Sequence, residues 1–114
     1  MRVTKSQLKR KLRKRDKIER CGLILNDGKI VETANIAPEP SISFRIPSDD
    51  LLKYEDQLAG TWHTHIDGDA NLSAADYVGF CNWPSLTHYI IGTIRGSKEV
   101  RKYHVEAGLV VNSE

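Results

Sequence analysis

Two histidines and an aspartate stand close together in the middle of the chain and could hold a metal ion. His63 and His65 are two residues apart in a segment, 61–66, that we predict to be a strand, so both imidazoles would point to the same face. A helix beginning at Ser73 would place Asp76 in its first turn, where the carboxylate can return to the histidines. Two nitrogens and one carboxylate oxygen form a ligand set that catalytic zinc sites use, with a further position left for water.

Each part of this pattern also has an explanation without zinc. The same ligands could hold iron in a facial triad, and histidines two apart occur on strands that bind no metal. Ser73 and Asp76 also form a helix-capping pair. The combination of same-face histidines, a short polar loop and a carboxylate at a helix start favours the metal site, because hydrophobic packing requires none of these features.

The spacing of these residues resembles the signature of a known family. His63-Thr64-His65, seven residues, Ser73, two residues and Asp76 match the JAMM signature of the JAB/MPN metallopeptidases at every defining position. The residue after the second histidine is Ile66, whereas members often have proline there. That difference concerns the shape of the loop and not the ligand set.

A second segment extends the resemblance. Glu19 precedes Cys21-Gly22-Leu23, which is similar to the glutamate and core strand that the family carries upstream of its signature, and the similarity runs to about Thr93. The stretch from Leu72 to Asp76 is most similar to compact prokaryotic and phage members, such as the JAB domain of phage tail-assembly proteins.

The resemblance implies a fold, a ligand set and a reaction. The fold would be the cytidine-deaminase-like JAB/MPN fold. His63, His65 and Asp76 would be the ligands of a zinc ion. Glu19 would be the general acid and base acting on the zinc-bound water, and Ser73 would help to stabilise the oxyanion. The implied activity is amide hydrolysis by a zinc metallopeptidase or isopeptidase, with a peptide or a ubiquitin-like protein as the substrate.

Two other classes of function remain as alternatives. The domain could be a phage tail or other assembly factor that mainly binds a partner and holds a non-catalytic zinc. It could also be a nucleic-acid-associated module that uses its basic first segment. The complete signature argues against a purely structural zinc, which would more often have four protein ligands.

The basic first segment is the main asymmetry of charge. Residues 1–20 contain ten Lys and Arg against two acids, whereas residues 21–114 contain seven against thirteen. Such a segment can bind nucleic acid or an acidic partner. We expect instead a solvated helix face over an acidic body, and therefore no nucleic-acid partner.

The remaining composition predicts one domain, residues 1–114, of an intracellular protein. A chain of 114 residues is long enough for one core. No window approaches the roughly 18 apolar residues of a membrane helix, and the start has no apolar signal-peptide core. We expect Cys21 and Cys81 to be buried thiols in a reducing compartment. The expected location is the cytoplasm of a bacterial or phage-infected cell, or the virion.

Hydrophobic periodicity and turn residues predict an α/β (α+β) domain, with a mixed, mostly antiparallel sheet flanked by helices. A basic helix at about 4–17 would come first, then a hairpin around Asp27-Gly28. The further expected elements are strands at 33–36 and 42–46, a helix at 49–58 capped by Ser48, the strand at 61–66, a helix at 73–82, and strands at 89–93 and 100–105.

Overall fold

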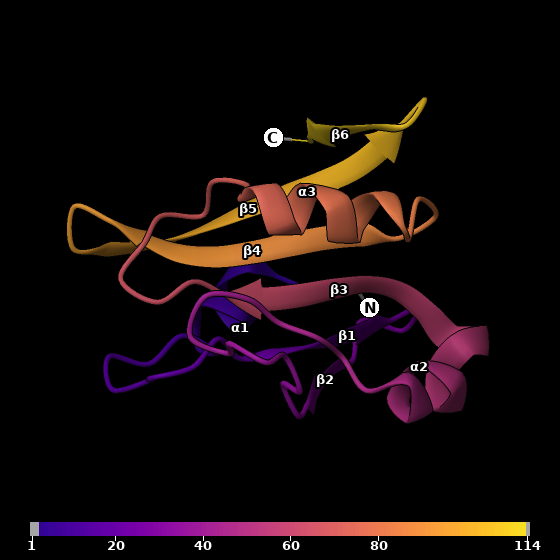
Figure 1. The fold of residues 1–114 in the computed structure, drawn as a ribbon, viewed down its shortest axis with the longest axis horizontal. Helices are drawn as coiled ribbons and strands as arrows, with labels where there is room; N and C mark the ends of the chain where they lie inside the picture. The colour runs from indigo at the N-terminus through magenta and orange to yellow at the C-terminus, as the bar shows by residue number, and fades with distance from the viewer. Residues whose placement is uncertain (1–2, 114) are drawn as a thin grey trace.

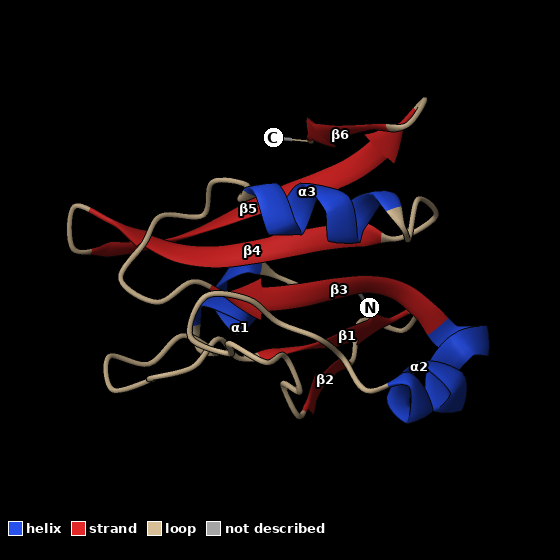
Figure 2. Cartoon of the chain, viewed as in Figure 1, coloured by secondary structure: helices blue, strands red, loops and turns tan. Residues whose placement is uncertain are grey.

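A six-stranded sheet runs through the middle of the molecule in this computed structural model, which describes residues 3–113 (Figures 1 and 2). In chain order the elements are α1 (Lys5–Lys9), β1 (Cys21–Leu25), β2 (Ile30–Thr33), α2 (Ser48–Tyr54), the 3-10 helix η1 (Glu55–Gln57), β3 (Leu58–Thr64), α3 (Ala74–Cys81), β4 (Thr87–Ile94), β5 (Ser97–Glu106) and β6 (Leu109–Asn112). The strand order is β2-β1-β3-β4-β5-β6. The fold is therefore of the α+β class, as predicted.

The sheet separates two clusters of buried side chains. Figure 1 shows α1 and α3 on opposite faces of the sheet. Because neighbouring residues of a strand point to opposite faces, Trp62 of β3 belongs to the cluster beside α1, whereas His63 contacts Phe80 of α3. The cluster beside α1 consists of Leu8, Leu12, Ile24, Trp62, Ile91 and Val100. The cluster beside α3 consists of Ala70, Phe80, Ile90 and Tyr103.

One pair of strands gives the sheet its mixed character. β3 and β4 are parallel, with His63 opposite Ile90, whereas the other pairs are antiparallel. Parallel neighbours require a crossover connection, and here residues 65–86 supply it as a loop followed by α3. The crossover begins at the end of β3, beside the histidines. It returns to the start of β4 through α3, which lies on the face of the sheet to which His63 points.

Most of the predicted elements form. β1 and β2 make the expected hairpin, in which Gly28 adopts a φ of 88°. The predicted second helix, third helix and last two long strands correspond to α2 with η1, α3, β4 and β5, and the last residues of the sheet form β6. Ser48 begins α2 but does not cap it, because Pro47 occupies the N-cap position.

The basic first helix is shorter than the predicted range of 4–17. α1 ends at Lys9, although both Leu8 and Leu12 are buried as their spacing predicts. A longer helix would place like charges four residues apart, as in Lys9 and Arg13, which destabilises a helix. The chain instead turns and runs as a loop toward Glu19.

The strands predicted at 33–36 and 42–46 are wrong. Residues 34–47 form an irregular segment, which we call the 34–47 loop. The amide of Ile36 donates to the carbonyl of Arg45 at 3.0 Å. Ile42 is 65% exposed, whereas Phe44 turns inward against His63. The alternation of apolar residues there reflects packing on an imidazole and not membership of the sheet.

β3 is also displaced from its predicted range of 61–66, since it runs from Leu58 to Thr64. The amide of His65 still donates to the carbonyl of Ile91 at 2.8 Å, so the chain follows β4 one residue beyond the strand. Among the described residues, no helix is long and apolar enough to cross a membrane.

Gly92 lets the crossover loop lie against β4, and this contact generates a prediction. A Cβ atom at Gly92 would lie 2.4 Å from the carbonyl carbon of Asp69 and 2.5 Å from the amide nitrogen of Ala70. We expect Gly92→Ala to lower the free energy of unfolding in urea by about 2 kcal/mol, because backbone atoms must shift. Gly79→Ala is the matched control, since nothing lies within 4 Å of its Cβ position in α3, and should stabilise by roughly 0.5–1 kcal/mol. Equal effects of the two substitutions would contradict the explanation.

Candidate metal centre

The two histidines lie at the end of β3 with their Nε2 atoms 3.2 Å apart. His63 is fully buried. Its ring stacks on Phe44, with centroids 4.1 Å apart and an interplanar angle of 21°, and meets the ring of Phe80 edge-on. The aromatic contacts fix the ring of His63 on both sides, so its Nε2 atom has a defined position.

Asp76 completes the group from the first turn of α3. Its Oδ1 lies 3.0 Å from Nε2 of His63, and its Oδ2 lies 3.0 Å from Nε2 of His65. Ser73 caps the helix, because its Oγ accepts from the amide of Asp76 at 3.1 Å while its own amide donates to Oδ2 at 3.2 Å. The capping pair that sequence analysis weighed against a metal site is thus present, and it also aims the carboxylate at the histidines.

The hydrogen bonds of His65 require a proton or a cation between its ring and Asp76. Nδ1 of His65 lies 2.7 Å from the carbonyl oxygen of Asp69. Since a carbonyl only accepts, Nδ1 must carry a proton. In a neutral His65 the Nε2 atom is then a bare acceptor that faces the Asp76 carboxylate and the other imidazole. A proton or a metal cation among these atoms would remove the repulsion between their lone pairs.

Burial and hydrogen bonding shift the pKa values of His63, His65 and Asp76 in different directions. Burial acts against charge on all three groups. It lowers the pKa of His63. For His65 the hydrogen bonds to Asp76 and Asp69 outweigh burial and raise the pKa. For Asp76 the hydrogen bonds from both histidines outweigh burial and hold the pKa well below its usual range.

The spacing of these atoms fits a tetrahedral cation. Zinc–nitrogen and zinc–oxygen bonds of about 2.0–2.1 Å separate two tetrahedral ligand atoms by about 3.3 Å. The three contacts among Nε2 of His63, Nε2 of His65 and the Asp76 oxygens are 3.0 to 3.2 Å. Small outward movements of these side chains would therefore admit a metal ion.

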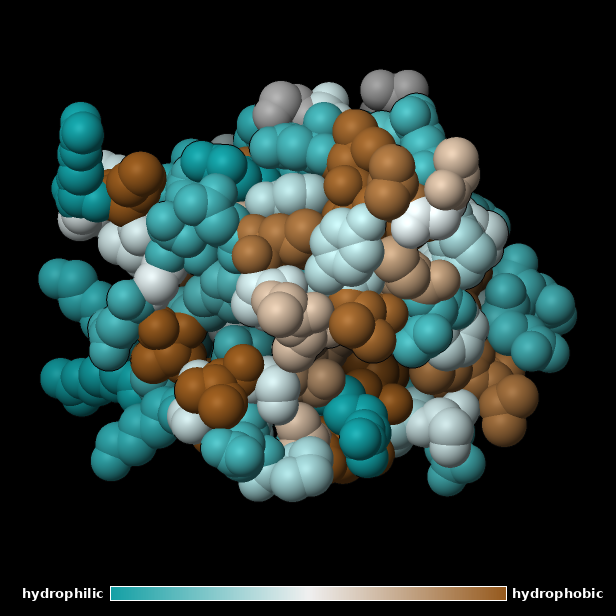
Figure 3. All heavy atoms as spheres, turned by 45° about the horizontal axis from the view of Figure 1, so that its top comes forward, coloured by the Kyte–Doolittle hydropathy of each residue, from teal (hydrophilic) through white to brown (hydrophobic). Residues whose placement is uncertain are grey.

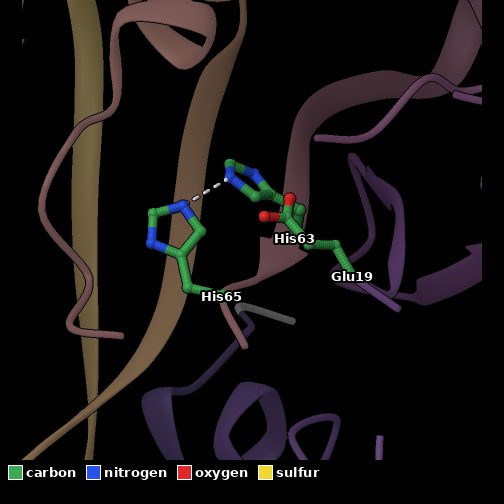
Figure 4. Close-up of side chains that lie close together, drawn as sticks. All are labelled: Glu19, His63 and His65. Carbon is green, nitrogen blue, oxygen red and sulfur yellow. Dashed lines mark hydrogen bonds between the residues drawn. The ribbon is translucent and has the colours of Figure 1, made fainter. Parts of the chain in front are cut away.

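Glu19 lies beside the same histidines. Its carboxylate and the two imidazoles can present one ligand atom each within 4.8 Å of one another, and Figure 4 shows the three groups pointing toward a common space. Glu19 is 4% exposed, and its Oε1 has no hydrogen-bond partner among the described residues. Burial raises its pKa from 4.5 to about 7, and the negative charge of Asp76 contributes in the same direction.

The backbone around Glu19 is held from both sides. The amide of Glu19 donates to the carbonyl of Pro40 at 2.7 Å. On the next residue, the amide of Arg20 donates to Oγ1 of Thr64 at 2.9 Å, and the amide of Thr64 donates to the carbonyl of Arg20 at 2.9 Å. The guanidinium of Arg20 also pairs with Glu32. These bonds join the position of Glu19 to the end of β3, where the histidines begin.

Asn35 is a residue of the site that sequence analysis missed. Its Nδ2 donates to the carbonyls of Glu19 and Ser43 at 2.8 and 3.0 Å, and its Oδ1 accepts from the amides of Ala37 and Arg45. One side chain thus ties Glu19 to the 34–47 loop. The sequence signal was weak, because an asparagine before a proline-containing segment usually indicates only a turn.

A cleft of about 730 Å³ adjoins the metal centre, and we call it the α3 cleft. It lies between the 34–47 loop and α3, and both Phe44 and Asp76 belong to its lining as well as to the group around His63. Trp83, just after α3, also lines it. Its other lining residues include Arg45, Ile46, Leu51, Val78, Phe80 and His88.

The other histidines and the cysteines have structural surroundings. His88 is buried between the Thr61 hydroxyl and the Trp83 carbonyl, and burial lowers its pKa to about 4. His104 lies at the surface beside Glu106. Cys21 is buried, as expected, and burial raises its pKa to about 11. Cys81 is only half-buried, so the expectation of a buried thiol is wrong there.

Known structures with this α+β fold exist, although sequence comparison finds no relatives. No protein-family model matches the chain, and no curated protein matches it. The solution structure of protein DSY2949 from Desulfitobacterium hafniense is 20% identical, with a TM-score of 0.70 over 96% of this chain and 84% of that one. A solution structure of a protein from Salinibacter ruber is 16% identical, with a TM-score of 0.57 over 100% of this chain and 89% of that one. At these identities the similarity establishes the fold and not the function.

The raised pKa of Glu19 predicts a pH-dependent stability of the metal-free protein. The folded pKa of about 7 exceeds the ordinary value of 4.5, so the folded state binds more protons between these values and loses stability as pH rises through them. We expect Glu19→Gln to be more stable than the wild type at pH 8, by at most about 3 kcal/mol, and nearly equal at pH 4. Thermal unfolding of both metal-free proteins across this range measures the difference. An unchanged difference between pH 4 and pH 8 would contradict the burial argument.

Proposed function

We propose that this chain is a zinc-dependent metallopeptidase or isopeptidase of the JAB/MPN (JAMM) type. The observation that carries the proposal is that Nε2 of the buried His63, Nε2 of the half-buried His65 and the Asp76 carboxylate meet at 3.0 to 3.2 Å. They lie beside Glu19, a buried residue with a raised pKa. His63, His65 and Asp76 are the proposed zinc ligands. The assignment includes the cytidine-deaminase-like JAB/MPN fold as the finer description of the α+β domain.

We propose zinc and not iron, because the proposed hydrolysis requires a Lewis acid and no change of oxidation state. A bound Zn²⁺ would act as a Lewis acid that makes a water molecule more acidic and polarises a carbonyl group. Glu19 would then serve as the proton carrier. Its burial beside the two histidines places a carboxyl group within reach of the proposed zinc-bound water, as general acid–base catalysis requires.

The proposed reaction is the hydrolysis of an amide bond. The Glu19 carboxylate takes one proton from water as the water oxygen bonds to the amide carbon. It then delivers this proton to the amide nitrogen as the carbon–nitrogen bond breaks, which leaves a carboxylic acid and an amine. Ser73 Oγ accepts from the Asp76 amide, so its own proton is free to donate to the substrate oxygen. A hydrogen bond to that oxygen stabilises the charge that develops there.

The proposed substrate is a peptide or the tail of a ubiquitin-like protein. The α3 cleft supports this choice, because its lining includes Asp76 and Phe44, which contact the histidines of the metal centre. The alternative proposal is a phage tail or other assembly factor that mainly binds a partner. For either function we propose a location in the cytoplasm or the virion, and we propose no nucleic-acid partner.

Metal analysis tests the ligand set. We expect one equivalent of zinc in the wild type and in Glu19→Gln, and a loss of affinity of more than about 100-fold in Asp76→Ala and His63→Ala, because each removes a ligand. His104→Ala is the control, since this surface histidine pairs with Glu106 far along the chain from the site. A full equivalent of tightly bound zinc in Asp76→Ala would refute the assignment. Zinc loss from Glu19→Gln would instead make Glu19 a ligand.

Turnover tests the role of Glu19. Zinc-loaded wild type should cleave members of a peptide and ubiquitin-like fusion panel, and Glu19→Gln should lower kcat by about 10²–10⁴-fold, because the proton carrier is lost. Cleavage products identified by mass spectrometry measure the effect. Wild-type turnover by zinc-loaded Glu19→Gln would exclude this role, and a zinc-binding protein without any hydrolysis would favour the assembly-factor hypothesis.

A further inference from the structure

The walls of the α3 cleft are largely apolar. Phe44 and Ile46 come from the 34–47 loop, and Val78, Phe80 and Trp83 come from α3 and the residues that follow it. In Figure 3, hydrophobic side chains gather around a recess near the centre of the visible face. A ligand side chain that enters the cleft therefore exchanges water for apolar contacts, which is favourable in proportion to the area buried.

Two large apolar side chains on one side of the cleft are exposed to solvent. Val78 is 64% exposed and Trp83 is 43% exposed. Val78 belongs to α3, whose buried residues are Asp76 and Phe80, and Trp83 follows this helix. Exposed apolar residues that gather beside a cleft mark a binding surface more often than isolated ones do.

The cleft also contains an uncompensated positive charge. Arg45 and Asp76 are the charged residues of its lining, and Asp76 is occupied by the two histidines. The guanidinium of Arg45 is exposed and forms no ion pair or hydrogen bond within residues 3–113. Its backbone is fixed, since its amide donates to Asn35 and its carbonyl accepts from Ile36. An acidic group on a ligand would find here a cation held by a rigid main chain.

We infer that the α3 cleft binds a peptide segment that carries a large apolar side chain and an acidic side chain close together. The apolar side chain packs between Val78 and Trp83, and the acidic side chain pairs with Arg45. The inference rests on the proposed function and specifies its substrate class. The enzyme then cleaves next to such a pair, because the cleft meets the metal centre at Asp76 and Phe44.

Cleavage of a peptide mixture tests this specificity. The probe is a synthetic mixture of random decapeptides, incubated with the zinc-loaded full chain, and mass spectrometry reads the residues around each cleaved bond. Leu, Phe and Met should be enriched at one fixed position by at least about 10-fold over Ala, which is the range expected for filling an apolar pocket. Glu and Asp should be enriched at a second fixed position.

Matched variants assign the two preferences to their residues. Val78→Lys and Trp83→Ala should abolish the apolar preference. Leu109→Lys and Ile94→Ala should keep it, although these residues are 61% and 43% exposed and thus equally accessible.

Arg45→Glu should exchange the acidic preference for Lys and Arg at the same position. Arg95→Glu, in the turn between β4 and β5, should leave it unchanged. A structural defect would lower all cleavage but would not reverse a charge preference.

The outcomes separate this inference from the proposed function. Cleavage without these preferences, or with preferences that Val78→Lys and Arg45→Glu leave unaltered, overturns the cleft assignment while the hydrolase stands. If the wild type cleaves nothing, immobilised zinc-loaded Glu19→Gln is used to capture peptides from the same mixture. Capture of apolar and acidic peptides that Val78→Lys abolishes supports the cleft while the hydrolase fails. If the wild type shows no cleavage and Glu19→Gln captures no peptide, both the proposed function and the cleft assignment are overturned.

Discussion

A buried carboxylate that faces two imidazole nitrogens is stable only when a proton or a cation lies between each oxygen and the nitrogen it meets. Asp76 meets the Nε2 atoms of His63 and His65 at 3.0 Å, and the Asp69 carbonyl fixes the proton of His65 on the opposite side of its ring. Within residues 3–113, the ion-pair partners of Asp76 are these two histidines, and no Lys or Arg joins them. The charge of the Asp76 carboxylate is therefore balanced by protons on the histidines or by a bound cation.

The fold serves this constraint by bringing three stretches of chain to one point. β3 delivers the histidines, the cap at Ser73 aims Asp76, and the bonds around Arg20 hold Glu19 against the end of β3. Glu19 is near enough to Asp76 for their charges to interact unfavourably, which adds to the effect of burial on its pKa. The arrangement thus keeps one carboxylate ionised and gives the other a pKa near neutrality, a separation typical of acid–base sites.

The parts of the site that follow local rules could be predicted from the sequence. Strand alternation places His63 and His65 on one face, and the capping pattern places Asp76 in the first turn of a helix. Glu19 could be assigned only through the family resemblance, because its approach to the histidines depends on the pairing of β1 with β3. That pairing joins residues far apart in sequence, about which periodicity says nothing.

The same distinction explains what was wrong or missed. The alternation at 42–46 is identical for a strand and for a loop that turns Phe44 onto an imidazole. Asn35 carried only a weak signal, because its bonds to Glu19, Ser43 and Arg45 form only when the 34–47 loop closes over Glu19. The helix over 4–17 failed because propensity was counted without the repulsion among its basic side chains.

The parallel pair β3 and β4 also has a consequence for the order in which the protein assembles. His65 and Asp76 are eleven residues apart and lie on one crossover, so a short segment can bring them together early in folding. Glu19 joins them through contacts such as that between Arg20 and Thr64, which are 44 residues apart, and long-range contacts of this kind form slowly. Under the proposed assignment, His65 and Asp76 therefore meet before Glu19 arrives, and the group becomes complete only when β1 has paired with β3.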